Sequence, residues 1–184
     1  VIFTAGGFYF CTGAAFNETG DTHAGTSAAR KDADTLFDSG VAANMRIAVL
    51  IYLLNTLPQY KVASIRGGNL GAGISVIASM DHVVAPERTT GFSFKEASRG
   101  LAACTSWQGV VAKLGVMTMR RLCLLAEDLD AYEAFQLGLV HEVLPASASA
   151  STKAAFLAAD ERAEAKAKDV AKLEEQERRS LKTT

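Results

Sequence analysis

Residues 67–81 read GGNLGAGISVIASMD, and this stretch decides how the rest of the chain is interpreted. Glycines crowd its first seven positions, a run of small and apolar residues follows, and an aspartate ends it. Glycine adopts tight backbone conformations that other residues resist, and the apolar run predicts a short buried helix over residues 74–80. The stretch is therefore either a plain turn or a place where backbone N–H groups at a helix start face a negative charge.

Strand and helix signals alternate on both sides of this stretch. Strands are predicted over residues 1–4, 61–67, 82–86, 90–94 and 139–145, and helices over residues 41–57, 74–80, 107–114, 117–125, 131–137 and 154–181. Pro58 ends the first of these helices, Gly115 separates two of them, and Gly138 follows the end of another. Residues 17–40 are polar with weak periodicity, which predicts a loop. The alternation predicts an α/β fold with a largely parallel sheet.

The composition is that of an ordinary globular domain. Of 184 residues, 49% are apolar and 21% are charged, and the formal net charge is -1. A nearly neutral chain lacks the basic surface that nucleic acid requires, and no apolar run reaches the ~18–20 residues that span a bilayer. The three cysteines form neither a disulfide framework nor a metal motif and fit a reducing compartment. We therefore expect no nucleic-acid or membrane partner, no bound metal, and a location in the cytoplasm or an organellar matrix.

Four segments in a fixed order carry a family resemblance. They are FCTGAAF (residues 10–16), PQYKVASIRGGNLGAGISVIASMDHVVAP (58–86), FSFKEASRGL (92–101) and AYEAFQLGLVHEVLP (131–145). In this order the segments resemble the crotonase superfamily, which contains the enoyl-CoA hydratases and isomerases. The resemblance implies a crotonase-like spiral of βα turns in residues 1–145, truncated at its N-terminus because the first part of the family fold is absent. Residues 146–184 are expected to be a linker and a polar, solvated C-terminal helix.

The resemblance also implies an acyl-thioester site at the glycine-rich turn. Members of the superfamily stabilise the enolate of an acyl thioester with two backbone N–H groups, which form an oxyanion hole. By position these are the N–H groups of Ala14 and Ala72, although the family usually has glycine at the second position. Donors fixed at a helix N-terminus stabilise a developing negative charge, and loss of one such donor typically costs ~3–4 kcal/mol of barrier. Gly71 and Gly73 flank Ala72 and are expected to line the substrate pocket.

Only one acid stands at a catalytic position of the family. Hydratases of the family hold and activate a water with two glutamates, whereas here Ser75 takes the first position and Glu96 the second. Ala15 replaces a further acid that usually follows the oxyanion segment. Glu96 is therefore predicted to be the single general acid/base, with a pKa raised by an apolar pocket. Asp81 is interpreted as tethering the strand that follows it. The other residues predicted at the pocket are Phe92, Phe94, Cys104 and Trp107.

The first of the three functions that follow is favoured by the sequence, and the other two remain open as alternatives. The segments FCTGAAF, FSFKE and GLAACT resemble the dehydratases of polyketide β-branching, which act on a hydroxymethylglutaryl group carried as a thioester on an acyl carrier protein. One carboxylate is also enough for the proton shift of a Δ3,Δ2-enoyl-CoA isomerase. The replacements at Ala15, Ala72 and Ser75 fit a non-catalytic, crotonase-like scaffold as well. No cofactor is expected beyond the coenzyme A or phosphopantetheine of the substrate. The expected partners are an acyl-CoA or acyl carrier protein and further copies of the chain, usually in a trimer.

Overall fold

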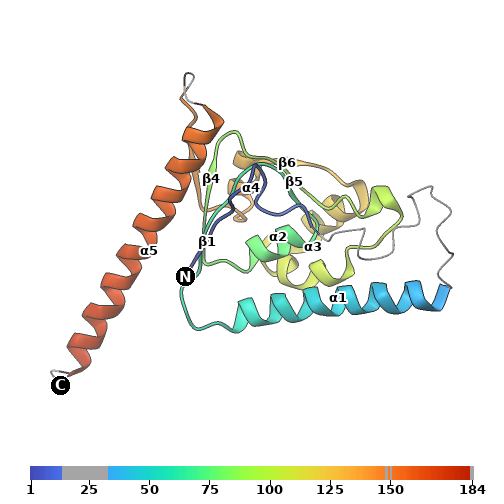
Figure 1. Ribbon diagram of the computed structural model, residues 1–184, viewed down its shortest axis with the longest axis horizontal. Coiled ribbons are helices and arrows are strands. Elements are labelled where there is room, and N and C mark those ends of the chain that lie inside the picture. The colour runs from blue at the N-terminus through green and yellow to red at the C-terminus, as the bar shows by residue number, and fades with distance from the viewer. Residues whose placement is uncertain (14–32, 148, 150, 183–184) are drawn as a thin grey trace.

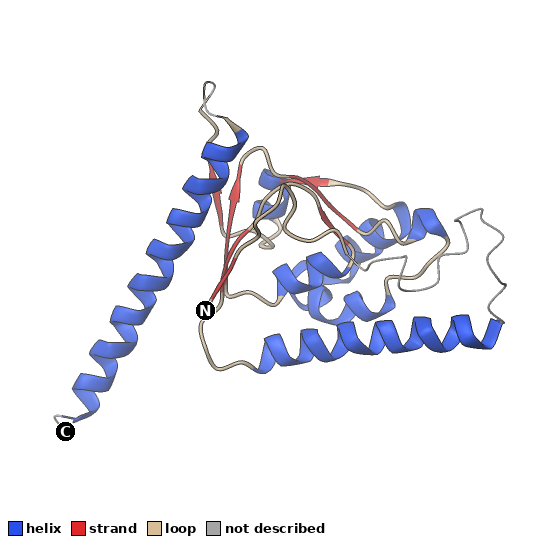
Figure 2. Ribbon diagram, in the orientation of Figure 1, coloured by secondary structure: helices blue, strands red, loops and turns tan. Residues whose placement is uncertain are grey.

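The computed structural model describes residues 1–13, 33–147, 149 and 151–182 (Figures 1 and 2). In chain order, its elements are β1 (Ile2–Phe3), α1 (Ala33–Thr56), β2 (Val62–Ser64), β3 (Asn69–Leu70), α2 (Ala72–Ala78), β4 (His82–Pro86), β5 (Thr90–Ser93), the 3-10 turn η1 (Ala97–Arg99), α3 (Cys104–Leu125), β6 (Leu129–Asp130), α4 (Ala131–Gln136), β7 (Glu142–Leu144) and α5 (Thr152–Lys182). None of the helices in these described ranges is long and apolar enough to cross a membrane.

Two small sheets organise these elements. The larger has the order β1-β2-β4-β7 and is parallel throughout, with α1 and α2 in the first two crossovers. The smaller has the order β3-β5-β6, in which β3 and β5 are parallel and β6 is antiparallel. The parallel α/β prediction is confirmed for the larger sheet. In the smaller sheet only the β5–β6 pair is antiparallel, so a largely parallel arrangement holds for the described strands. β3 and β6 are two residues long and too short to give a periodic signal.

The larger sheet is covered on both faces, with α5 on one side and α1, α2 and α3 on the other (Figure 1). Side chains alternate between the faces of a strand. Val62 and Val84 point to the α5 side, whereas Ala63, Val83 and Ala85 join the main core beneath α2 and α3. Short, almost wholly apolar strands are the pattern expected for a parallel sheet that is buried on both faces.

α5 departs from the solvated helix that its composition predicts. Ala159 and Ala163 are fully buried against β2 and β4, so the first half of the helix packs on the sheet. A polar contact fixes this packing, because Asp160 accepts hydrogen bonds from Thr4 Oγ1 (2.8 Å) and from the buried Arg66 guanidinium (2.5 Å). The same guanidinium lies over the Phe156 ring, 4.9 Å from its centroid. Asp160 has a lowered pKa because these hydrogen bonds outweigh the opposing effect of burial.

Several helices begin before their predicted starts; α3, for example, begins at Cys104 rather than at residue 107. α1 begins at Ala33, inside the predicted polar loop, because Asp, Ser and Gly weaken the helical signal there without preventing a helix. α2 begins at Ala72, two residues before the predicted start. Two glycine predictions are confirmed: Gly115 interrupts α3 with φ 75°, and Gly138 follows α4 with φ 77°.

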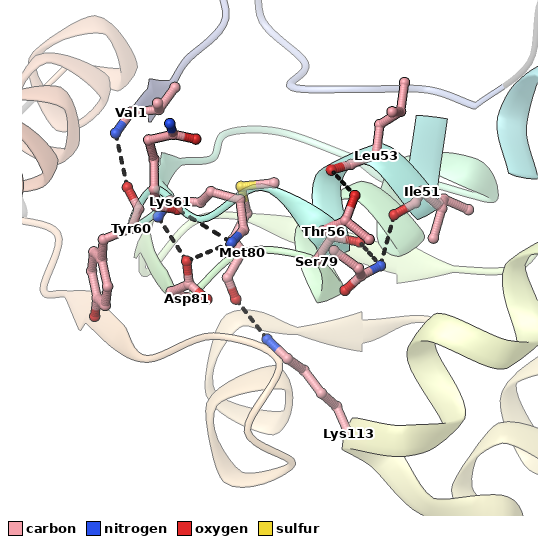
Figure 3. Close-up of polar contacts among 12 residues, drawn as sticks. Val1, Ile51, Leu53, Thr56, Tyr60, Lys61, Ser79, Met80, Asp81 and Lys113 are labelled. Atoms are coloured by element: carbon pink, nitrogen blue, oxygen red, sulfur yellow. Dashed lines mark hydrogen bonds and ion pairs between the residues drawn. The ribbon is translucent and has the colours of Figure 1, made fainter. Parts of the chain in front are cut away.

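Asp81 ties the start of β4 to the neighbouring strand β2, which agrees with its interpretation as a tether for the strand that follows it (Figure 3). Its Oδ2 accepts a hydrogen bond from Lys61 N (2.7 Å) and pairs with Lys61 Nζ (2.8 Å), just before β2. Asp81 N donates to Lys61 O (2.9 Å), so the start of β4 is held beside the start of β2. From α3, Lys113 Nζ donates to Met80 O (2.7 Å) and closes the same corner.

The Asp160→Asn substitution should lower the free energy of unfolding by about 2 kcal/mol, because it leaves the Arg66 guanidinium buried without its charged partner. Chemical denaturation of the full chain measures this. The matched control is Asp169→Asn, which removes an exposed ion pair with Lys172 from the same helix and should change stability by less than about 0.5 kcal/mol. Equal effects of the two substitutions would contradict the role assigned to Asp160.

Candidate active site

The glycine-rich turn between β2 and α2 is held by backbone hydrogen bonds from two directions. Leu70 N donates to Cys11 O (3.0 Å), and Gly71 N donates to Ser93 O (2.9 Å) at the end of β5. Gly71 has φ 53° and ψ -121°, a conformation that residues with a side chain rarely adopt, and α2 begins at the next residue. The turn therefore depends on glycine, and it joins the segment around Cys11 and the end of β5 to the start of a helix.

The Glu96 carboxylate lies directly against this turn. A Cβ placed on Gly71 would overlap Glu96 Oε1 and stand 3.3 Å from Glu96 Cδ. The backbone at this corner is fixed, because Arg99 N and Leu101 N each donate to Glu96 O (2.9 Å). The structure thus brings the predicted acid and the predicted turn into contact.

Burial governs the chemistry of Glu96. Its side chain is half-buried, and no group in the described part of the chain hydrogen-bonds to Oε2, which is shielded from solvent. Burial raises the pKa of Glu96, against the opposing effects of its own backbone N–H and of the Arg99 charge. Burial and the nearby Glu96 charge raise the pKa of the Cys123 thiol to about 11. Glu96 therefore holds a proton more readily than an exposed glutamate does, as a proton-transfer group requires.

Lys95 anchors the segment that carries Glu96. Lys95 Nζ donates to Ala126 O (3.0 Å) and pairs with Asp128 Oδ2 (2.8 Å). Ala126 ends α3 in the left-handed conformation (φ 51°), where a cation stabilises the exposed carbonyl end of a helix. These contacts of Lys95 with Ala126 and Asp128, which we name the Lys95 clamp, fix the end of α3 next to the Glu96 segment. The same part of α3 carries Cys123. The sequence pattern does not predict a role for Lys95 or Cys123 near Glu96. The hydrogen bonds of Lys95 and the position of Cys123 both depend on how α3 packs back against η1.

One of the two predicted oxyanion donors is in the described structure. Ala72 is the first residue of α2, so its N–H has no acceptor within the helix. Ala14 and Ala15 lie outside the described residues. Gly13, which precedes them, is close to the turn: a Cβ placed on it would lie 3.0 Å from Leu70 O and 3.9 Å from Ala72 N. The two-donor oxyanion hole stays a prediction, and the approach of Gly13 to Ala72 supports it.

The other predicted pocket residues lie in four different environments. Gly73 allows the segment around Cys11 to pass close to α2, since a Cβ on Gly73 would lie 2.7 Å from Cys11 O and 3.1 Å from Cys11 Sγ. Ser75 is fully buried in α2. Cys104 is exposed at the first position of α3. The predicted aromatic residues share one core with Cys123, and these are Phe92, Phe94 and Trp107.

The two histidines of the described ranges, His82 and His141, form a separate pair where β4 and β7 of the larger sheet begin. His82 begins β4, and its ring stacks on His141 with 5.5 Å between centroids. His141 Nδ1 accepts a hydrogen bond from Val83 N (3.1 Å), and burial lowers the pKa of both rings. These contacts give His82 a structural role at the start of β4. In the part of the chain that the structure describes, no three His, Cys, Asp or Glu side chains are grouped as a metal site would require.

Fold and turn together define a crotonase-like α/β protein. The profile of the family described as enoyl-CoA hydratase/isomerase matches residues 1–184. The chain therefore belongs to the enoyl-CoA hydratase/isomerase family, and the predicted fold class is confirmed. A search of curated protein sequences found no match.

Solved structures agree with the fold. An enoyl-CoA hydratase from Shewanella pealeana is 26% identical over 78% of this chain and 50% of that chain, with a TM-score of 0.65. An enoyl-CoA hydratase/isomerase from Marinobacter aquaeolei is 26% identical over 77% and 51%, with a TM-score of 0.62. An enoyl-CoA hydratase from Bacillus anthracis is similar in fold over 92% of this chain and 57% of that chain, with 23% identity and a TM-score of 0.71. The chain thus spans about half the length of these proteins.

The Gly71→Ala substitution should destabilise the chain by more than its backbone strain alone, because the added methyl group displaces the Glu96 carboxylate. The strain of a positive φ costs ~1–3 kcal/mol, and Gly138→Ala measures that cost at φ 77° with no neighbour in the way. We expect a larger loss for Gly71→Ala, measured by denaturation. The excess should disappear when Glu96→Ala is also present, and an excess that persists would contradict the contact.

Proposed function

We propose that this chain carries an acyl-thioester site in which the N–H groups of Ala14 and Ala72 stabilise an enolate and Glu96 moves the proton. The observation that carries the proposal is the contact between the Glu96 carboxylate and the turn at Gly71. It sets a proton acceptor beside one of the donors predicted for the thioester oxygen. A carbon next to a thioester carbonyl loses its proton only when the charge that develops on the oxygen is stabilised. Family membership supports an acyl thioester as the class of substrate.

The proposed reaction is dehydration of a β-hydroxyacyl thioester, of the kind that polyketide β-branching requires on a carrier-bound hydroxymethylglutaryl group. The Glu96 carboxylate takes the proton from the carbon next to the thioester, and the electron pair moves to the carbonyl oxygen. The electron pair then moves back from the carbonyl oxygen, a double bond forms between the α- and β-carbons, and the bond between the β-carbon and the hydroxyl breaks. Glu96 gives its proton to the departing hydroxyl, which leaves as water. One carboxylate therefore completes the cycle in its starting state.

A second candidate is a Δ3,Δ2-enoyl-thioester isomerisation, which uses the same groups. Glu96 would remove a proton from C2 of the substrate and return it to C4, while the oxyanion donors hold the dienolate between the two steps. Ser75 is buried where a hydratase of the family has its second glutamate, so the isomerisation, which needs one carboxylate and no water, is compatible with this site. A serine hydroxyl is a much weaker proton acceptor near neutral pH than a carboxylate.

The Glu96→Gln substitution should lower the rate ~10²–10⁴-fold while thioester binding is retained, because it keeps the shape of the side chain and removes the proton acceptor. Turnover is measured with a β-hydroxyacyl and a β,γ-enoyl thioester, each as the coenzyme A and the carrier-protein form. Binding is followed by thermal shift. Asp128→Asn, which alters the Lys95 clamp and leaves the carboxylate in place, is the comparison for indirect effects.

The four substrates separate the alternatives. Turnover of the carrier-bound β-hydroxyacyl form supports the β-branching dehydratase, and turnover of the enoyl form supports the isomerase. A wild-type chain that binds thioesters and turns over neither supports the scaffold interpretation. Turnover that Glu96→Gln leaves unchanged would contradict the mechanism.

The pH profile of kcat/KM should show an acid limb above the ordinary pKa of glutamate. Burial raises the pKa of Glu96, and only the carboxylate accepts a proton, so activity should rise with pH through this raised value. The Arg99→Ala substitution should move the limb to higher pH, because the Arg99 charge lowers the pKa of Glu96. Arg88→Ala removes an arginine of the turn between β4 and β5 and should leave the limb in place. A limb that does not move with Arg99→Ala would argue against Glu96 as the titrating group.

A further inference from the structure

The segment that carries Glu96, residues 95–101, lies beyond the end of the β5–β6 ladder. β5 and β6 pair as far as Phe92 and Leu129, and Glu96 follows four residues after Phe92. The hydrogen bonds that Glu96 O accepts come from the same segment, so they fix its internal shape rather than its place in the molecule. The position of the Glu96 carboxylate against Gly71 therefore depends on the contacts that this segment makes with other elements.

Lys95 makes such a contact with the end of α3. Its Nζ donates to Ala126 O (3.0 Å) and pairs with Asp128 Oδ2 (2.8 Å), in the connection that leads from α3 into β6. The Lys95 clamp thus continues, through a side chain, the pairing of two chain segments that the backbones of β5 and β6 begin. Because Glu96 is the next residue, a movement of Lys95 passes directly to it.

The end of α3 that the clamp holds is strained. Ala126 has φ 51° and ψ 35°, and among the residues that the structure describes it is the one residue other than glycine with a positive φ. A residue with a Cβ adopts this conformation at a cost, and such strain persists only where the surroundings fix it. The Lys95 ammonium group on Ala126 O is a fixing contact, and it places a positive charge at the negative end of a helix. The strain therefore indicates, independently of Glu96, that this corner is held firmly.

The charge of Lys95 acts on Asp128. The hydrogen bond from Lys95 is the largest effect on the pKa of Asp128, which it lowers. The pKa of Glu96 is raised by burial and lowered by its own backbone N–H and by the Arg99 charge, and the Glu96 charge in turn raises the pKa of Cys123 on α3. The glycine-rich turn and β5 contribute no charged residue. An effect of Lys95 on Glu96 is therefore expected to come from position.

We propose that Lys95 is a positioning residue for Glu96, which holds the carboxylate beside Gly71 by tying the Glu96 segment to the end of α3. This role rests on the proposed function, in which the carboxylate moves the proton. A displacement of about 1 Å at a reacting group can cost ~100-fold in rate, so a tether one residue away should affect turnover strongly. The same displacement admits water to the carboxylate and so lowers the pKa that burial has raised.

The Lys95→Met substitution tests the tether, because it keeps an unbranched side chain and removes the donors. We expect kcat to fall ~10–100-fold with KM changed less than ~3-fold, and the acid limb of kcat/KM to move to lower pH. Loss of a positive charge near Glu96 would instead move the limb to higher pH, as expected for Arg99→Ala, so the direction of the shift separates position from charge. Lys95→Arg keeps a charged donor for Ala126 O and Asp128 and should recover most of the rate.

The Ala126→Gly substitution separates positioning from stability. Combined with Lys95→Met, it should raise the midpoint of chemical denaturation, because glycine adopts the left-handed conformation without strain. The kcat should stay low, because Glu96 is still without its tether. Recovery of kcat together with the midpoint would overturn the positioning role. Lys172→Met is the matched control, since it removes a lysine from an exposed ion pair with Asp169 on α5 and should leave kcat and the acid limb unchanged.

Titration of the Glu96 carboxyl tests the role of Lys95 without turnover. Carbon NMR of the full chain with labelled glutamate follows the titration, and the Glu96 signal is assigned by its loss in Glu96→Gln. Lys95→Met should lower the pKa of Glu96 whether or not a thioester is turned over. An unchanged or raised pKa would overturn the positioning role. A wild-type chain that turns over no thioester would overturn the proposed function instead, and the two failures are thereby distinguished.

Discussion

The missing side chain at Gly71 is the constraint on which the candidate site depends. Its backbone conformation directs the chain from β3 into α2, and the space where a Cβ would stand is occupied by the Glu96 carboxylate. The hydrogen bond from Gly71 N to Ser93 O holds the turn beside the end of β5, and Glu96 follows three residues later. One glycine thus sets both the start of the helix and its distance from the acid.

Burial has the largest effect on the protonation of this carboxylate. Burial favours the neutral form of Glu96, and the same burial keeps the Cys123 thiol protonated. Arg99 opposes the shift only partly, because its side chain is on an exposed turn. Ser75 adds no second charge nearby. A single half-buried carboxylate suits a reaction in which one group takes a proton from the substrate and gives it back, either to carbon or to a departing hydroxyl.

The sequence predicts the features that glycine and apolar periodicity encode. The breaks at Gly115 and Gly138, the strand of residues 82–86 and the helix after the turn all come from local signals. The antiparallel β6 and the two-residue β3 have no such signal, because they exist only through pairing with β5. In the site, the resemblance pointed to Glu96 and Ala72. Lys95 and Cys123 could not be found this way, since their contacts depend on how far α3 runs before it ends at Ala126. The burial of Ala159 and Ala163 likewise depends on a sheet that α5 itself does not encode.

The use of backbone donors explains how such a site tolerates sequence change. Ala72 stands where the family usually has glycine, yet an alanine N–H at the first position of a helix points in the same direction as a glycine N–H. What cannot change is the absence of a side chain at Gly71 and Gly73, because Glu96 on one side and Cys11 on the other occupy that space. The closeness of three chain segments, rather than the identity of many side chains, therefore defines the site. A fold shared with solved structures at 23–26% identity is compatible with that kind of constraint, since packing distances can be kept while most of the surface changes.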